Sequence, residues 1–308
     1  MENVTYFNEL RISPFASRAQ DKALIFGLFL LIYMIGVLVN VCIIAVIFLD
    51  SHLHSPMYLF LCMLSFVDLC YTTVVIPKLL SMLLSIDNRV SLAQCFTQMF
   101  FFFLASGAED ILLAVMAYDR YVAICKPLRY TKILNRRNCL HIMTGLWVAG
   151  CLNSIIFTMS ACNMTFCGSN TIQQLYCDSK ALTKIACDGT EPFNTVMYLE
   201  MLVFGLGSFL CSLTSYIKII TIIFRMKSEV GKKKVFSTCS SHLTVLMLYY
   251  STAGSVYLMP QSKQFHLLDQ VLTALYSTVT PILNPLIYSL RNQDVVRAFL
   301  RLIQLKDK

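Results

Sequence analysis

The side chains best suited to chemistry in this sequence are charged residues that lie inside or at the end of apolar stretches. Asp119, Arg120 and Tyr121 form the centre of the segment MAYDRYVAIC, and Asp68 and Glu200 interrupt other apolar runs. Ionised side chains are costly near lipid, so they face protein or water and commonly carry function there. Arg120 can pair with Asp119 and be released when neighbouring helices separate. The alternative is that Arg120 only extends to the lipid headgroups.

These charged residues do not predict an enzyme. No cluster of His, Cys or carboxylate residues has metal-ligand spacing, no glycine-rich phosphate loop occurs, and no nucleophile stands beside a base. A membrane transporter or channel is the alternative from another class. It would require broken helices in paired halves, or rows of ionisable groups along a path. The sequence has neither feature, which disfavours both classes.

Composition predicts an all-α membrane protein. The chain has 308 residues, of which 57% are hydrophobic and 14% charged, whereas soluble domains carry roughly 25% charged residues. Seven apolar runs are long enough to cross a bilayer, at residues 23–49, 57–84, 94–123, 140–159, 195–224, 235–259 and 267–290. The predicted organisation is an extracellular tail over residues 1–22, a seven-helix bundle over 23–290, and a cytoplasmic helix and tail over 291–308.

The loop charges predict the orientation of the bundle. The segment after the third run carries five basic residues and no acid, and the segment before the sixth run is also basic. Cytoplasmic loops retain positive charge, so the N-terminus is expected outside and the C-terminus inside. This sidedness explains the net charge of +8 without a nucleic-acid partner. Residues 295–302 place their apolar side chains on one helical face, which predicts a short amphipathic helix on the inner membrane surface.

Four segments in a fixed order carry a resemblance to a known family. They are LHSPMY at residues 53–58, MAYDRYVAIC at 116–125, KVFSTCSSH at 234–242 and PILNPLIY at 281–288. Together they closely resemble the vertebrate odorant (olfactory) receptors, a branch of the rhodopsin-like G-protein-coupled receptors. The resemblance runs from Asn3 to the C-terminus. Tyr118 and Phe236 are more similar to the tetrapod-type branch (class II) than to the fish-like branch.

The resemblance implies a receptor that activates a stimulatory, olfactory-type G protein and raises cAMP. It assigns contact with the G protein to the freed Arg120 of the Asp119-Arg120-Tyr121 motif. The segment 234–242 would face the G protein or anionic lipids, or would serve only as an anchor. A second switch is implied near the end of the last span, where a proline removes a backbone donor and bends the helix. Its residues are Asn284, Pro285 and Tyr288, with Tyr216 as the partner of Tyr288.

A membrane-embedded polar cluster of Asn40, Asp68 and Asn284 is also implied by the resemblance. In related receptors this cluster holds water or sodium. An aspartate at bilayer depth is too costly unless polar groups lie beside it. The alternative is that these groups only pack helices together. No other cofactor is expected.

The resemblance places a ligand cavity among the outer halves of helices three, five, six and seven. Its aromatic and aliphatic wall would suit a small volatile or modestly hydrophobic odorant, although each aromatic side chain could instead pack helices together. The predicted wall consists of Phe102, Phe103, Ser106, Gly107, Glu200, Phe204, Tyr250, Ala253, Gly254, Tyr257, Thr273 and Ser277.

Two residues narrow the ligand chemistry. Phe102 stands where amine receptors of this class place an aspartate, which disfavours a classical amine receptor. Glu200 is an uncommon acid in an apolar helix, and one hypothesis is that it binds a cationic or hydrogen-bond-donating ligand. The alternative is that Glu200 pairs with Lys184 or reaches outer water. Asp110 has no assigned role.

Five of the thirteen cysteines are expected at the oxidising outer face. The resemblance pairs Cys95 with Cys177 and Cys167 with Cys187, which leaves Cys162 without a partner. Sequence alone does not fix this connectivity. Related receptors often carry a histidine, which belongs to a proposed metal site, at the position of Gln174. Because glutamine replaces this ligand here, no metal is expected.

The remaining expectations concern location and ligand source. Asn3 begins a glycosylation sequon, whose alternative is an unused chance match. The resemblance implies the plasma membrane of sensory cilia. The runner-up function is a receptor of the same scaffold for a nonvolatile lipid, pheromone or metabolite outside the olfactory system.

Overall fold

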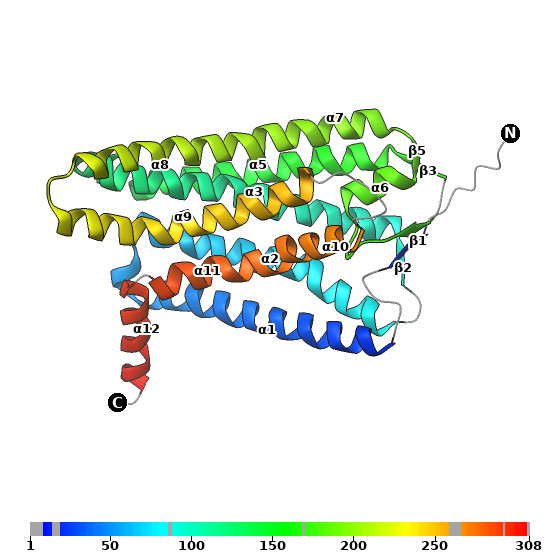
Figure 1. Cartoon of the computed structure of the whole chain (residues 1–308), viewed down its shortest axis with the longest axis horizontal. Helices are drawn as coiled ribbons and strands as arrows, with labels where there is room; N and C mark the ends of the chain where they lie inside the picture. Colours follow the sequence, from blue (N-terminus) through cyan, green and yellow to red (C-terminus); the bar gives the residue numbers. More distant parts are fainter. Residues whose placement is uncertain are drawn as a thin grey trace.

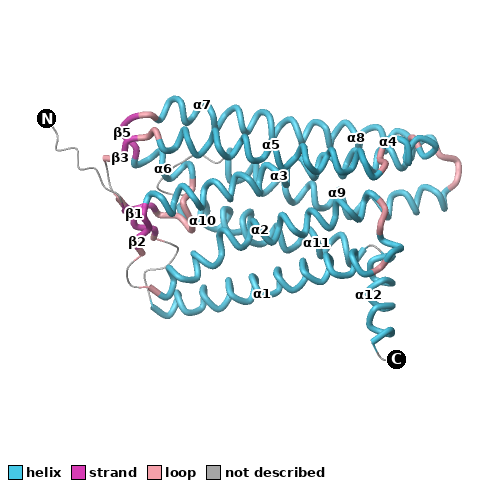
Figure 2. Tube along the Cα trace, turned by 180° about the vertical axis from the view of Figure 1, so that it is seen from behind, coloured by secondary structure: helices cyan, strands magenta, loops and turns pink. Residues whose placement is uncertain are grey.

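Long helices lying side by side form the body of the molecule (Figure 1, Figure 2). The computed structural model describes residues 9–13, 19–85, 88–167, 170–258, 266–291 and 293–306. Continuous long helices are α1 (Ala19–Leu49), α2 (Pro56–Leu84), α3 (Leu92–Cys125), α5 (Arg136–Cys162) and α9 (Glu229–Leu258). Short helical turns in the loops are η1 (Ser51–Leu53), η2 (Pro127–Arg129), α4 (Tyr130–Ile133) and α6 (Ser179–Ile185).

Two further rods of the bundle are each interrupted by a π-helical segment. One rod runs through α7 (Thr190–Glu200), η3 (Met201–Leu206) and α8 (Gly207–Arg225). The other runs through α10 (His266–Ala274), η5 (Leu275–Val279) and α11 (Thr280–Arg291). A π-helical turn widens the helix by one residue and is frequent at functional sites.

The seven predicted runs correspond to these seven rods, with longer bounds at most ends. In the described part of the chain, five rods are long and apolar enough to cross a membrane: α1, α2, α3, α5 and the rod α7–η3–α8. The α9 helix is long enough, but its first half contains several lysines, serines and threonines. The last rod is divided by η5 into helices of 9 and 12 residues.

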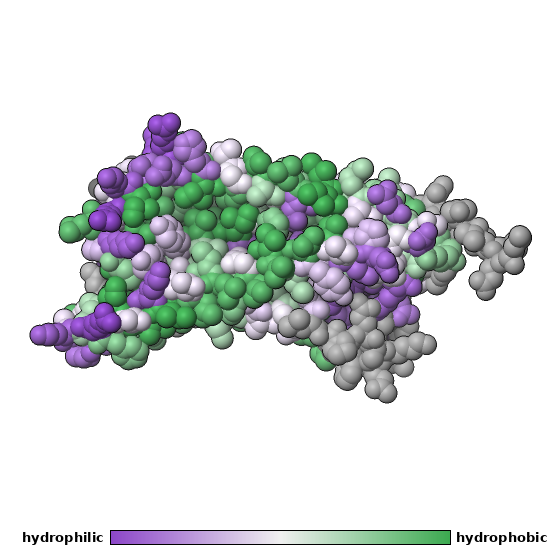
Figure 3. All heavy atoms as spheres, turned by 90° about the horizontal axis from the view of Figure 1, so that it is seen from above, coloured by the Kyte–Doolittle hydropathy of each residue, from purple (hydrophilic) through white to green (hydrophobic). Residues whose placement is uncertain are grey.

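The surface of the bundle is strongly apolar. The side chains of Leu24, Leu38 and Phe48 on α1 are 74%, 64% and 72% exposed, and α5, α7 and η3 carry many similar residues. Figure 3 shows this surface as a broad apolar band between more polar ends. A soluble monomer rarely exposes so large a patch, so the bundle is built to be solvated by lipid.

Local sequence signals fix where several helices begin. The Ser91 hydroxyl accepts a hydrogen bond from the backbone N–H of Gln94 at 3.2 Å. The Gln94 side-chain oxygen in turn accepts one from the backbone N–H of Ser91 at 3.3 Å. This reciprocal capping box starts α3. Asn135 caps α5 by accepting from the Asn138 N–H at 2.8 Å. Pro56 opens α2, where its missing N–H has no helical partner to lose.

The α3 helix lies at the centre of the bundle and contacts α2, α5, α8 and α9. Its approach to α5 depends on Gly150, where a Cβ atom would lie 3.3 Å from the Leu104 carbonyl oxygen and 3.2 Å from its Cδ1. Small residues let membrane helices approach this closely. By contrast, a Cβ atom on Gly145 of the same helix would meet nothing within 4 Å.

Replacing Gly150 by leucine is therefore expected to destabilise the receptor by about 1–3 kcal/mol, because the longer side chain forces α5 away from α3. The measurement is the melting temperature of the purified receptor, with cell-surface expression as a second readout. Gly145→Leu is the matched control and should leave both values near wild type. Equal losses in the two variants would contradict the packing account.

Short strands and two disulfides organise one end of the bundle. Strand β1 (Glu9–Ile12) pairs antiparallel with β2 (Arg89–Ser91) and parallel with β4 (Thr171–Ile172). Strand β3 (Thr165–Phe166) pairs antiparallel with β5 (Ala186–Asp188). The loop between α5 and α7 contains β3, β4, α6 and β5, and this loop is called the lid below.

The structure joins the same cysteine pairs that the resemblance implies. Cys95 at the start of α3 is bonded to Cys177 of the lid, with Cα atoms 5.4 Å apart. Cys167 and Cys187 are bonded within the lid at a Cα distance of 5.9 Å. Cys162 is free and exposed. The lid is thereby fixed to the central helix. The sequon residue Asn3 lies outside the described residues.

At the opposite end, α12 (Gln293–Lys306) lies across the bundle (Figure 1). Arg301 donates to the Asp50 carboxylate through Nε at 3.1 Å and Nη2 at 2.6 Å. Tyr58 also donates to Asp294 at 3.1 Å. The bonds from Arg301 lower the pKa of Asp50 to about 2. The predicted amphipathic segment thus forms a longer helix that is tied to the α1–α2 loop.

We expect Arg301→Gln to lower the melting temperature of the purified receptor by a small amount near neutral pH. Because the pKa of Asp50 falls from 3.8 to about 2 on pairing, the pair stabilises the fold above pH 4 and loses this effect as the pH falls toward 2. The difference between variant and wild type should be constant from pH 7 to 5 and shrink below pH 4. Arg297→Gln on the same helix is the control. A difference that grows on acidification would contradict the assignment.

Candidate functional site

The inner end of α3 carries the Asp119-Arg120-Tyr121 motif in a closed arrangement. Asp119 is 1% exposed and accepts from Arg120 Nε at 2.8 Å and from the Tyr130 hydroxyl at 2.8 Å. Burial raises the pKa of Tyr130, so its hydroxyl stays a donor to this carboxylate. Arg120 therefore binds Asp119, although the sequence also allowed it to extend to headgroups. The ammonium groups of Lys126 and Lys218 lie 5.3 and 5.2 Å from the ring centre of Tyr121.

A second contact connects α8 to α9 close to this motif. The hydroxyl of Tyr216 and Nδ1 of His242 are 2.7 Å apart, and both side chains are nearly fully buried. The sequence singled out His242 only as the last residue of the segment 234–242. The predicted partner of Tyr216 is Tyr288, whose backbone belongs to α11 but whose side chain lies outside the described residues. Pro285 lies within α11.

The polar cluster lies at the contact of α1, α2, α3 and α11. Asn284 donates to Glu109 Oε1 at 2.9 Å, and Asn40 donates to the Gly36 carbonyl at 3.0 Å. Asp68 is fully buried and interacts electrostatically with Glu109. Glu109 is the member that the sequence did not assign to the cluster. Its place follows from the bundle geometry rather than from any motif.

Several oxygens of this cluster have no protein donor in the part of the chain that the structure describes. They are both carboxylate oxygens of Asp68 and the amide oxygens of Asn40 and Asn284. Buried polar atoms of this kind normally bind water or an ion. The donor set of two carboxylates and two amides suits sodium or water. In the same described part, no group of three His, Cys, Asp or Glu residues could hold a metal ion.

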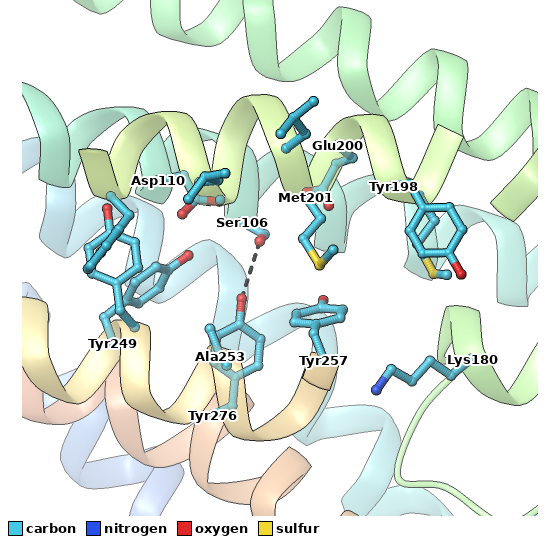
Figure 4. Close-up of a pocket in the computed structure, with 17 residues that line it drawn as sticks. Ser106, Asp110, Lys180, Tyr198, Glu200, Met201, Tyr249, Ala253, Tyr257 and Tyr276 are labelled. Carbon is cyan, nitrogen blue, oxygen red and sulfur yellow. Dashed lines mark hydrogen bonds between the residues drawn. The ribbon is translucent and has the colours of Figure 1, made fainter. Parts of the chain in front are cut away.

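A cavity of about 660 Å³ lies between α3, the α7–η3 rod and α9, beside the lid. Figure 4 shows its polar side chains pointing inward from these elements. The volume is in the range of small-molecule binding sites, which are mostly apolar with a few placed polar groups. Most of its wall is aromatic or aliphatic, from Met201 and Phe209 on one side to Tyr249 and Tyr257 on the other.

Comparison with known proteins identifies the family. The sequence profile of the family described as olfactory receptor matches residues 29–306, nearly the whole chain. The chain belongs to the olfactory receptor family. It is 39% identical to Olfactory receptor 1L3 of Homo sapiens over 303 residues, which cover 98% of this chain and 93% of that receptor. It is 41% identical to Olfactory receptor 1E1 of Pan troglodytes over 305 residues, covering 99% and 97%.

Family membership makes this chain a G-protein-coupled receptor and not an enzyme. An olfactory receptor is a seven-helix membrane bundle, in agreement with the seven rods described above. The rods α9 and α10–η5–α11 are therefore also membrane-spanning members of the bundle.

Half of the predicted ligand wall lines the cavity of this olfactory receptor. These residues are Ser106, Glu200, Tyr250, Ala253, Gly254 and Tyr257. Ser106 and Tyr276 both line the cavity, and their hydroxyls point toward each other at 3.4 Å (Figure 4). Their roles as ligand contacts stay predictions.

Two predicted phenylalanines pack against other rings instead of lining the cavity. Phe102 is 3% exposed and lies 4.9 Å, between ring centres, from both Tyr71 and Tyr176. Phe103 is stacked on Phe157 at 3.7 Å. The alternative of helix packing thus describes both side chains in this structure.

The other four predicted residues also lie outside the cavity wall. The Phe204 ring lies against Gly107, since a Cβ atom added to Gly107 would be 3.6 Å from that ring. Ser277 donates to the Thr273 carbonyl at 2.7 Å, and both side chains are buried. Each π-helical turn adds a residue and rotates the following face. Tyr276, within the π-helical segment η5, lines the cavity, and the sequence did not assign it to the wall.

The cavity also contains two charged residues that the sequence did not place there. Asp110 lies beside Ser208, whose hydroxyl is 3.5 Å from Asp110 Oδ1. Lys180 of α6 reaches in from the lid, donates to the Val256 carbonyl and lies 5.5 Å from the Tyr257 ring centre. Burial lowers the pKa of Lys180 and raises the pKa of its neighbour Asp178 to about 6. The only sequence signal for Lys180 was its position three residues after Cys177.

Gln174 has a structural role at the position where related receptors often carry a histidine. Its amide donates to Asp269 of α10 at 2.6 Å. This contact joins the lid to the last rod.

Proposed function

We propose that this olfactory receptor binds small, mostly hydrophobic odorants in the cavity and activates a stimulatory, olfactory-type G protein, which raises cAMP. The observation that carries the proposal is the 660 Å³ cavity with its largely apolar wall. A ligand there touches α3, the α7–η3 rod and α9 together, and these same helices carry the inner switch residues. Binding can therefore bias how the helices are arranged.

The proposed orientation places the lid and β1 outside the cell and α12 inside. The basic segments between α3 and α5 and before α9 lie at the α12 end, which is the cytoplasmic side by the positive-inside rule. The proposed location is the plasma membrane of sensory cilia, with glycosylation at Asn3. The amphipathic α12 would rest on the inner membrane surface.

The proposed mechanism is a shift between two arrangements of the bundle. In the resting arrangement Asp119 holds Arg120, and the Tyr216–His242 contact holds α9 against α8. A ligand that binds better when the inner end of α9 moves away from α3 favours the second arrangement. Arg120 then leaves Asp119 and, with the inner loops, contacts the G protein. The ligand shifts the equilibrium only by its differential affinity for the two arrangements.

The polar cluster would support this shift. Asp68, Asn40 and Asn284 would hold water or sodium through the oxygens that lack protein donors. Such a bound group would supply positive charge or hydrogen bonds to Asp68. The three residues themselves fix how α1, α2 and α11 meet.

The test is a cAMP assay of the full-length receptor with a stimulatory G protein against a broad odorant panel. Ala253 lines the cavity, whereas Ser255 on the same helix is exposed. Ala253→Trp should therefore abolish an odorant response at unchanged surface expression, and Ser255→Trp should preserve it. If the receptor reaches the surface and no odorant raises cAMP, the proposed odorant function falls and nonvolatile lipids and metabolites become the next panel.

A further inference from the structure

Two carboxylates face the same cavity from neighbouring helices. Asp110 on α3 is 6% exposed, and Glu200 ends α7. They are close enough to interact electrostatically. Figure 4 shows both on one side of the cavity, with Tyr257 and Tyr276 opposite. Two ionised carboxylates that interact in an apolar cavity repel each other, so either bound protons or a bound cation must offset their charge.

The protein supplies no cation to these two acids in the part of the chain that the structure describes. Asp110 contacts the Ser208 hydroxyl at 3.5 Å and interacts with Tyr249. Glu200 makes no hydrogen bond or ion pair with a described residue, which includes Lys184. Both Asp110 and Glu200 therefore keep acceptor atoms for a molecule in the cavity.

Lys180 also lines the cavity, but its ammonium group contacts residues other than the two acids. Its ammonium donates to the Val256 carbonyl and lies over the Tyr257 ring. Its electrostatic partners are Asp178 and Asp269 of the outer face. Lys180 thus balances Asp178 of the lid and Asp269 of α10, and no described cation pairs with Asp110 or Glu200.

The opposite wall suits a cation because it is a row of tyrosine rings. The ring centres of Tyr250 and Tyr249 are 5.4 Å apart, those of Tyr249 and Tyr276 are 6.0 Å apart, and those of Tyr276 and Tyr257 are 6.2 Å apart. Aromatic faces attract ammonium groups through the ring quadrupole. The tyrosine row is a second observation that favours the same ligand charge as the two acids.

We infer that the cavity recognises small organic amines, with the ligand ammonium held between Asp110 and Glu200 and its apolar part against the tyrosine row. This inference rests on the proposed function in so far as the cavity is the ligand site. The acids come from positions other than that of Phe102, so the arrangement differs from the aspartate site that the sequence disfavours. Glu200 acts as the main ion-pair partner because it has no competing protein contact.

The experiment measures binding and signalling separately on the full-length receptor. Binding is followed as the rise in melting temperature of the purified receptor, since a ligand of the folded state stabilises it. The probes are hexylamine and 2-phenylethylamine, each compared with the alcohol of the same carbon skeleton. Signalling is followed as cAMP in cells. Glu200→Gln removes the charge with little change in shape, and Glu191→Gln, an exposed acid on the same helix, is the control.

The expected result is that the amines stabilise the receptor more than their alcohols. Glu200→Gln should weaken amine binding by about tenfold or more, Glu200→Asp should recover part of it, and Glu191→Gln should match wild type. Asp110→Asn should also weaken amine binding while leaving alcohol binding unchanged. The inference is overturned if alcohols bind as well as amines, if no amine binds, or if Glu200→Gln binds amines like wild type.

The two readouts separate this inference from the proposed function. Amine binding that depends on Glu200 without any cAMP response would sustain the amine site and contradict the G-protein coupling. A cAMP response to neutral odorants without amine binding would sustain the receptor function and contradict the amine site.

Discussion

Replacing Asp119 by asparagine should raise basal cAMP by about fivefold or more, a change typical of a coupling free energy of 1–3 kcal/mol. The physical reason is that Asp119 is the acceptor for both Arg120 and the Tyr130 hydroxyl. Asparagine keeps the shape but removes the charge, so Arg120 loses its ion pair and the arrangement with a free arginine gains population. Removing one partner of a buried pair leaves the other charge uncompensated.

Arg120→Ala is the complementary variant and should abolish the ligand-evoked cAMP response. It removes the group proposed to contact the G protein, so amine or odorant binding to the purified receptor should persist. Glu229→Gln, an exposed acid near the start of α9, is the control and should leave basal cAMP unchanged. Basal activity of Asp119→Asn equal to wild type, at equal surface expression, would show that the pair does not restrain signalling.

The second large effect concerns the disulfide between Cys95 and Cys177. Cys95→Ser should eliminate surface expression and ligand response, because the bond fixes the lid to α3 across 82 residues of sequence. Loss of such a bond costs about 2–5 kcal/mol, which is a large part of the stability of a typical domain. Flow cytometry of an N-terminal tag on intact cells measures the effect.

The cysteine series has two internal controls. Cys177→Ser and the double variant Cys95→Ser/Cys177→Ser should be no worse than Cys95→Ser, since the three variants remove the same bond. Cys162→Ser should behave like wild type, because Cys162 is free and exposed. Normal surface expression of Cys95→Ser, or a loss in Cys162→Ser as large, would contradict the assigned role.

Motif-based features of the fold and site could be predicted from the sequence because they depend on local or covalent patterns. The apolar runs predicted the seven rods, and Asp119 is adjacent to Arg120 in the sequence. The amphipathic segment after Arg291 forms α12. The cysteine pairing came from the family resemblance, and the structure contains the same two bonds.

Features that depend on helix rotation could not be predicted in this way. The rod α7–η3–α8 contains a π-helical segment over Met201–Leu206, which no local sequence pattern predicted. Phe204 in this segment lies against Gly107 and not in the cavity wall. In the last rod, Tyr276 within η5 lines the cavity, whereas the predicted Thr273 and Ser277 do not.

Contacts between residues that are far apart along the chain could not be predicted from the sequence either. Glu109 receives a hydrogen bond from Asn284, 175 residues away, and no spacing rule connects the two. Asp110 and Glu200 come together because α3 lies beside the α7–η3 rod. Single acids in apolar helices indicated that something functional was present, but only the packed bundle shows which acids share a cavity.

The most direct test of ligand-driven coupling is a cryo-electron microscopy structure of the receptor with an agonist from the cAMP panel and a stimulatory G protein. The account predicts agonist density in the cavity beside Ser106 and Tyr257. It also predicts that the inner end of α9 has moved away from α3, and that Arg120 contacts the G protein instead of Asp119. Agonist density at another place on the bundle, or an Arg120–Asp119 pair that persists in the active complex, would contradict it.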